Sequence, residues 1–247
     1  MTKKIMFNDR YGLTEAVLEG RKTMTRRIIP EKYSKWIDRL SKGVLVISEE
    51  SVPADMSIEE FAKQWSESGR IMIATHEEPE AQIIGGWEDY IIATISRFQK
   101  DEEVAVAQRY YDIWMQSPDQ INLTFADRYI NESGWKNKMF VRADVMPHHI
   151  RITDIKVERL QDISEKDCLK EGIQSLRTPN GEVYVAGGVR INESDKERIR
   201  CGRVTVADII KHDTTQEAFA ALIDKVSGKG TWGRNPWVFV YSFELVR

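Results

Sequence analysis

The sequence predicts an α+β protein built on a mixed, mainly antiparallel β-barrel, with flanking short helices and inserted segments. Helical and strand patterns do not alternate at the spacing of parallel βαβ units, and no repeat period is visible. The chain ends in the β-branched and aromatic run Trp237–Phe243, which is typical of a buried strand. These observations favour a mainly antiparallel sheet over a doubly wound parallel one.

The first predicted elements are a helix and two strands. A short helix is expected at Leu13–Glu19, where apolar residues recur on one side and Gly20 follows the last turn. Val104–Ala107 is typical of a short strand, and the alternation of polar and apolar residues in Ile150–Leu160 predicts a longer one.

Two further helices precede the last strand. Ser164–Asp167 has the pattern of a capping box, and Gly172 is placed to end the short helix that it begins. Thr215–Val226 carries an apolar stripe at helical spacing and is followed by Gly228. The terminal run described above then supplies the last strand.

The chain is predicted to form one domain over residues 1–247. Its intervening segments are acidic, aromatic or rich in turn signals, and they are interpreted as insertions on a scaffold. The barrel pieces are predicted at about 1–29, 96–109, 138–175 and 230–247, and the insertions at about 30–95, 110–137 and 176–229.

The charge of the chain is low overall and uneven along its length. The 247 residues are 41% hydrophobic and 30% charged, with a net charge of −3, which argues against bulk coating of nucleic acid. Residues 1–35 carry nine Lys or Arg against four Asp or Glu, whereas residues 48–103 carry four against fourteen. The sequence is therefore compatible with a local basic site, and also with two solvated charged faces.

No apolar stretch approaches the roughly 20 residues of a membrane helix. Residues Met1–Arg10 lack the apolar region of a signal peptide, so we expect a cytoplasmic protein with no membrane partner. The two cysteines, Cys168 and Cys201, fit a reducing compartment and are too few for a disulfide framework.

The densest functional signal is the basic turn Gly20–Arg27, which follows the first predicted helix. It holds four cations and two hydroxyls within eight residues. Its amides, hydroxyls and guanidinium groups can together hold a phosphate or a polarised carbonyl oxygen. A lysine desolvated among cations can also act as a base toward a neighbouring hydroxyl. The alternative is a solvated turn that complements the helix dipole.

The pattern Gly20-x-Lys22-Thr23-x-Thr25-x-Arg27 resembles the signature of the ASCH family, small proteins built on a PUA-like β-barrel. Ile150–Ile173 is similar to the strand and helix of phage- and prophage-encoded members, and Trp232–Val240 is similar to their closing segment. The matched pieces occur in the right order and cover roughly a third to a half of the chain.

This resemblance implies a barrel with a cleft that faces RNA or a nucleotide. One branch of the family is a bacterial amidohydrolase that deacetylates N4-acetylcytidine, and its catalytic lysine, threonine and glutamate match Lys22, Thr25 and Glu171. In that chemistry Thr25 attacks the acyl carbon, Lys22 takes the hydroxyl proton, and Glu171 orients the lysine or returns a proton to the leaving amine. We therefore expect Lys22 and Glu171 to meet in one nucleotide-sized cavity.

Residue spacing leaves this arrangement open. Lys22 and Thr25 share a face in a helical turn but lie on opposite faces of a strand. Glu171 lies in the last turn of a predicted helix, and the alternative interpretation is a solvated residue on the surface of that helix. The other residues expected to contact the ligand, or to stabilise an oxyanion, are Arg21, Thr23, Arg26, Arg27 and Trp232.

The aromatic and histidine residues give weaker signals. Trp232 and Tyr110-Tyr111 are candidates for stacking on bases, whereas Trp237 is predicted to lie in the core. The adjacent residues His148 and His149 point to opposite faces of a strand, which disfavours joint metal binding. We expect no metal and no cofactor.

Three functions of different classes follow. The leading hypothesis is binding of RNA or a modified nucleoside or nucleotide in the basic cleft. The alternative is an amidohydrolase that deacylates N4-acetylcytidine-like substrates through the threonine, lysine and glutamate. A second alternative is a phage-derived accessory protein whose barrel mediates protein contacts. The sequence does not indicate the oligomeric state.

Overall fold

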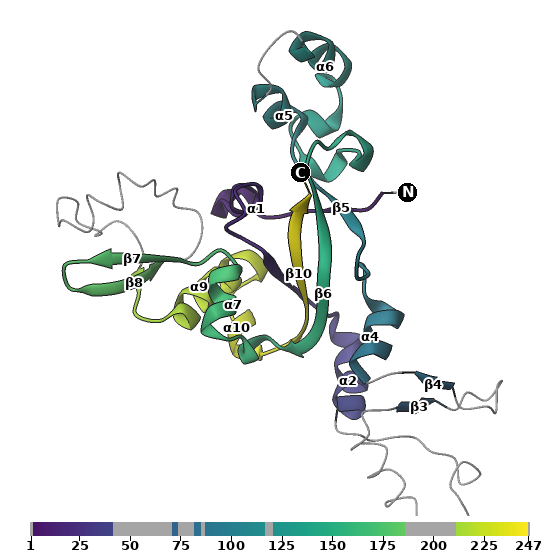
Figure 1. Ribbon diagram of the computed structural model, residues 1–247, viewed down its shortest axis with the longest axis vertical. Coiled ribbons are helices and arrows are strands. Elements are labelled where there is room, and N and C mark those ends of the chain that lie inside the picture. The colour runs from purple at the N-terminus through teal and green to yellow at the C-terminus, as the bar shows by residue number, and fades with distance from the viewer. Residues whose placement is uncertain are drawn as a thin grey trace, which may run out of the picture.

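The computed structural model describes residues 2–41, 71–73, 82–84, 87–116, 121–185 and 211–246 (Figure 1). These residues form an α+β protein with a mostly antiparallel sheet and short helices. The strands are β1 (Lys4–Ile5), β2 (Met24–Ile28), β3 (Ile71–Ile73), β4 (Gln82–Ile84), β5 (Glu103–Val106), β6 (His149–Arg159), β7 (Gln174–Thr178), β8 (Gly181–Val185), β9 (Lys211–His212) and β10 (Trp237–Val246). The helices are α1 (Leu13–Leu18), α2 (Ser34–Ser41), α4 (Trp87–Ile95), α5 (Tyr110–Gln116), α6 (Ile121–Tyr129), α7 (Glu165–Lys170), α9 (Thr215–Ser227) and α10 (Thr231–Arg234).

The central sheet has the strand order β1-β5-β6-β10-β2. β1 pairs with β5 in parallel, and the other neighbours are antiparallel. The two long strands β6 and β10 lie side by side along the middle of the molecule (Figure 1). No ladder joins β1 to β2 among the described residues, so the sheet is open where the sequence predicted a closed barrel. β1 has only two residues before the chain turns into the 3-10 helix η1 (Asp9–Tyr11), and no strand in the described ranges covers the outer edge of β2.

Local signals in the sequence account for the helices that flank the sheet. The predicted first helix is confirmed as α1, and Gly20 beyond it has a φ of 73°. The predicted capping of α7 is also confirmed, because the Ser164 hydroxyl accepts a hydrogen bond from the Asp167 amide. Gly172 ends this turn with a φ of 101°.

The main apolar core lies between the sheet and the helices α1, α2, α4, α7 and α9. Trp237 is buried in this core as predicted, and the first five residues of β10 are all buried because this strand is central in the sheet. A second, smaller core is centred on Tyr110 of α5 and Tyr129 of α6. Tyr110 is fully buried there, so its predicted role as a stacking platform is wrong.

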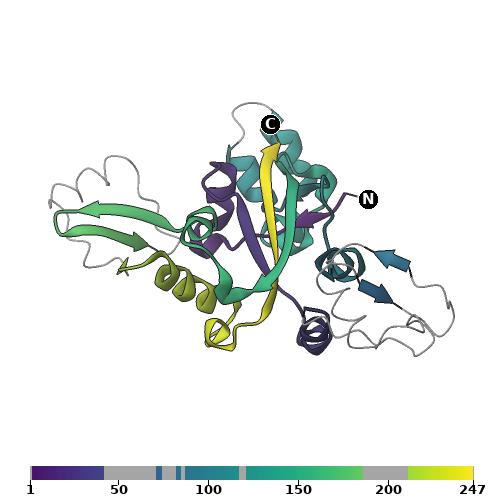
Figure 2. The same ribbon diagram turned by 60° about the horizontal axis from the view of Figure 1, so that its bottom comes forward.

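The predicted insertions contribute folded elements. Residues 110–137 include α5 and α6, and the described parts of 30–95 include α2, α4 and the β3–β4 pair. The β7–β8 hairpin projects from the body of the molecule, and α9 packs against α7 and β8 (Figure 2). None of the helices in the described ranges has both the length and the apolar character needed to cross a bilayer.

Candidate functional site

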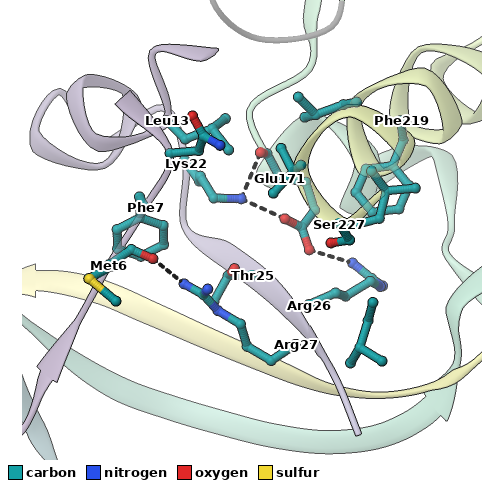
Figure 3. Close-up of a pocket in the computed structure, with 15 residues that line it drawn as sticks. Met6, Phe7, Leu13, Lys22, Thr25, Arg26, Arg27, Glu171, Phe219 and Ser227 are labelled. Carbon is teal, nitrogen blue, oxygen red and sulfur yellow. Dashed lines mark hydrogen bonds and ion pairs between the residues drawn. The ribbon is translucent and has the colours of Figure 1, made fainter. Parts of the chain in front are cut away.

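A cavity of about 270 Å³ lies along β2, between that strand and α9 (Figure 3). We call it the β2 pocket. Its walls come from the chain after β1, the start of α1, β2, the end of α7 and α9. It is lined by Met6, Phe7, Asn8, Leu13, Lys22, Thr25, Arg26, Arg27, Ile28, Glu171, Phe219, Leu222, Ile223, Val226 and Ser227.

Main-chain hydrogen bonds fix the basic segment beside α7. The Lys22 amide donates to the Ala16 carbonyl of α1, which turns the chain back after Gly20. The next amide, that of Thr23, donates to the Lys170 carbonyl at 3.0 Å. Two segments almost 150 residues apart in sequence are therefore joined next to Lys22, and the residue after Lys170 is Glu171.

Lys22 and Glu171 form a buried ion pair in the β2 pocket. The Lys22 amine lies 2.5 Å from the Glu171 Oε2 atom and donates to the Glu171 main-chain carbonyl at 2.7 Å (Figure 3). The two residues are only 2% and 4% exposed. Burial lowers the pKa of the Lys22 amine below its ordinary value, against the attraction of Glu171, and the nearby guanidinium groups add to the lowering. A lowered pKa favours the neutral amine, the form that acts as a base.

Arg26 extends the ion pair into a chain of charges. Its Nη1 atom lies 3.2 Å from Glu171 Oε1, and its Nε and Nη2 atoms donate to Glu158 of β6. The guanidinium also lies over the Phe219 ring of α9, 5.9 Å from the ring centroid. Glu171 is thus held between two cations, which fixes its carboxylate in one orientation.

Arg27 keeps a donor free in the same pocket. Its Nη2 atom donates to the Met6 carbonyl at 2.6 Å, and its guanidinium lies over the Phe7 ring. Its Nε atom is buried and has no hydrogen-bond partner in the part of the chain that the structure describes. Burial lowers the pKa of Arg27, although a guanidinium remains charged at neutral pH. An unpaired buried donor in a pocket points to a ligand or a solvent molecule as its partner.

Thr25 lies on β2 with its side chain in the pocket. No hydrogen bond joins its hydroxyl to any described residue, and in Figure 3 the hydroxyl points toward Lys22 and Glu171. Thr25 and Arg26 are consecutive residues of β2, so their side chains lie on opposite faces of the strand. Lys22 precedes the strand, which begins at Met24. The pocket includes both faces because it follows the outer edge of β2.

Three predicted ligand contacts lie outside the lining of the pocket. Arg21 is exposed and pairs with Glu19, and Thr23 is used in the main-chain bond to α7. Trp232 of α10 packs its ring against Phe219, behind the apolar wall. The structure therefore brings together Lys22, Thr25, Arg26, Arg27 and Glu171, but not Arg21, Thr23 or Trp232.

The apolar wall of the pocket was not predicted. It consists of the α9 residues Phe219, Leu222, Ile223 and Val226, within a segment interpreted as an insertion. Their helical spacing is visible in the sequence, but the spacing shows only that the stripe is buried, not which element it covers. Met6 and Phe7 gave no signal beyond their apolar character.

No group of three or more His, Cys, Asp or Glu side chains in the described ranges is arranged to hold a metal ion. Comparisons of the chain with protein-family models, curated proteins and solved structures found no match.

Proposed function

We propose that the protein is an ASCH-type, PUA-like amidohydrolase that binds an acylated nucleoside of the N4-acetylcytidine type in the β2 pocket. The observation that carries this proposal is the buried Lys22–Glu171 pair beside the free hydroxyl of Thr25. A base with a lowered pKa, a carboxylate that orients it and an unbonded hydroxyl are the groups that amide hydrolysis requires. The cavity is slightly below the roughly 300–1,000 Å³ of drug-sized sites, as expected for a single nucleoside base with its acyl group.

The first half of the reaction acylates Thr25. As its oxygen bonds to the acyl carbon, the hydroxyl proton passes to the Lys22 amine in its neutral form, which the lowered pKa favours, and the carbonyl oxygen becomes an oxyanion. The free Nε–H of Arg27 is available to stabilise this oxyanion. The carbon–nitrogen bond then breaks, and Lys22 returns the proton to the leaving amine.

Water completes the cycle. It adds to the acyl carbon while Lys22 takes its proton, and the bond to the Thr25 oxygen breaks as that oxygen regains a proton. In the ligand-free protein Glu171 orients the amine, because it accepts through both its carboxylate and its main-chain carbonyl. Among the described residues Lys22 makes no hydrogen bond to Thr25, so the amine must move toward the hydroxyl when substrate binds.

Deacetylation of N4-acetylcytidine by the purified protein tests this function. We expect Lys22→Met and Thr25→Ala each to reduce the rate at least about 100-fold, and Thr25→Ser to keep part of it. Thr23→Ala is the matched control, since this hydroxyl is nearby in sequence but does not line the pocket. Deacetylation that persists when Lys22 and Thr25 are replaced together would show that the roles are wrong.

Binding of RNA or a nucleotide without catalysis is the second candidate. It is favoured by the charge of the pocket lining, which includes the cations Lys22, Arg26 and Arg27 but only one carboxylate, Glu171. A compact site with few phosphate contacts should give a shallow dependence of affinity on salt. Tight binding of short RNA oligomers with no turnover of N4-acetylcytidine would favour this candidate.

A further inference from the structure

The outer edge of β2 presents main-chain groups that the sheet does not use. In the β2–β10 ladder, Ile29 donates its amide to the Trp237 carbonyl, and Phe243 donates to the Thr23 carbonyl. Thr25 and Arg27 lie at odd-numbered positions between Thr23 and Ile29, so their main-chain groups also point toward β10. The even-numbered residues Met24, Arg26 and Ile28 therefore direct their N–H and C=O groups away from β10.

Two of the residues that carry these outward groups line the β2 pocket. Arg26 and Ile28 both line it, β2 is the last strand of the sheet, and no hydrogen bond joins the Arg26 or Ile28 main chain to a described residue on that side. Arg26 is 6% exposed, whereas Ile28 is 39% exposed. The edge therefore runs from an open end at Ile28 to a closed end at Arg26. An unpaired main-chain group of a buried residue such as Arg26 requires a partner, and the Ile28 amide lies where a ligand can reach it.

The pocket excludes an added polypeptide strand as that partner. α9 covers the edge with the buried side chains of Phe219 and Leu222, and the Glu171 side chain occupies the closed end. A strand of several residues needs an edge that is open along its length. A small planar molecule that enters beside Ile28 needs only one donor and one acceptor.

We propose that the Arg26 carbonyl and the Ile28 amide bind the edge of the substrate base. The carbonyl accepts from the exocyclic N–H, and the amide donates to the adjacent ring nitrogen. A C=O of one residue and the N–H of the second residue after it lie next to each other on the same side of a strand, which matches this adjacent pair. The inference rests on the proposed function and names what the pocket selects, namely a heterocycle with an amino or acylamino group beside an unprotonated ring nitrogen.

This edge separates cytosine-type bases from uracil. Cytosine keeps both features, and an N4-acyl group still leaves one N–H on the exocyclic nitrogen. Uracil has a carbonyl and a ring N–H in those positions. Its carbonyl would face the Arg26 carbonyl, and its N–H would face the Ile28 N–H, so neither pair could form a hydrogen bond. Buried polar groups left unpaired in this way reject the wrong ligand more strongly than a change of shape does.

Equilibrium binding of cytidine, the reaction product, tests the inference apart from catalysis. We expect uridine and N4,N4-dimethylcytidine to bind at least about tenfold more weakly than cytidine. Ile28→Pro removes the outward N–H but no bond of the β2–β10 ladder, so it should fold and lose cytidine affinity by a similar factor. Ile28→Val keeps the N–H and measures the part of any loss that comes from the side chain.

The outcomes separate the inference from the proposed function. Equal affinity for cytidine, uridine and the dimethyl analogue overturns the edge contact, even if N4-acetylcytidine is hydrolysed. Unchanged affinity in a folded Ile28→Pro variant does the same. A preference for cytidine that is lost in Ile28→Pro supports the contact, even if no deacetylation occurs and the proposed function fails. If Ile28→Pro does not fold, the relative affinities of the unaltered protein for cytidine, uridine and N4,N4-dimethylcytidine still test the edge contact.

Discussion

Replacing Glu171 should destabilise the protein more than replacing its partner Lys22. Glu171 pairs with both Lys22 and Arg26 inside the β2 pocket. In Glu171→Gln, Lys22 loses its carboxylate partner in a buried position, while Arg26 keeps Glu158 at 2.7 Å. In Lys22→Met, Glu171 keeps Arg26, and an apolar side chain of similar length takes the place of the buried amine.

The difference can be sized from these contacts. Removing one partner of a buried ion pair costs about 3–5 kcal/mol, which is the expectation for Glu171→Gln. Lys22→Met removes the two hydrogen bonds that the amine donates to the Glu171 carboxylate and main-chain carbonyl, while the carboxylate keeps Arg26, so we expect a cost of about 2–4 kcal/mol. The two variants should therefore differ by about 1 kcal/mol, or roughly 0.5 M in the urea midpoint at the usual dependence on denaturant.

Urea unfolding of the two single variants and of the double variant measures this. The double variant should be more stable than the sum of the two losses predicts, because it leaves no lysine without its carboxylate. An equal or smaller loss in Glu171→Gln than in Lys22→Met would refute the reasoning. Additive losses in the double variant would also refute it, since they would mean that the two side chains do not interact.

Burial lowers the pKa of Lys22 in the folded protein below its ordinary value of 10.5. At pH values between the folded-state pKa and 10.5, the unfolded chain therefore binds more protons than the folded protein. The free energy of unfolding should rise with pH in this window. Urea unfolding over alkaline pH tests this, and Lys22→Met should remove that contribution. In a Cys201→Ser variant, Cys168 should resist alkylation near neutral pH while folded, because burial raises its pKa to about 11; rapid labelling would contradict this. Gly134→Ala should lower stability by about 1–3 kcal/mol in urea unfolding, because the new Cβ would lie 2.5 Å from the Tyr110 ring; an unchanged midpoint would contradict this.

The helices could be predicted from the sequence where the signal is local. Ser164 and Gly172 mark the ends of α7 through their own hydrogen bonding and backbone geometry, which depend little on the rest of the chain. The sequence predicts a basic turn at Gly20–Arg27, but the structure places Met24–Ile28 in the strand β2. It is a strand because β10 pairs with it, and that pairing is not visible in its own residues.

The candidate site could be predicted only in part. The meeting of Lys22 and Glu171 followed from the family resemblance, because residue spacing does not reveal that the Thr23 amide reaches Lys170. Trp232 was expected in the site because an indole suits stacking on bases. Its residue type does not show which side of α10 it occupies, and it packs against Phe219 instead.

The segments that carry the buried charges of the pocket are also joined by other contacts. The Thr23–Lys170 main-chain bond and the packing of α9 against α7 already join the segments that carry them. Apolar residues of similar volume in place of a buried ion pair are often neutral or stabilising by about 1–4 kcal/mol. A desolvated pair with a lowered lysine pKa, next to an unbonded hydroxyl and an unpaired guanidinium N–H, therefore gives no stability beyond that of an apolar pair of similar volume. Such an arrangement is explained when the same groups act on a ligand, which is why we base the function on this pocket.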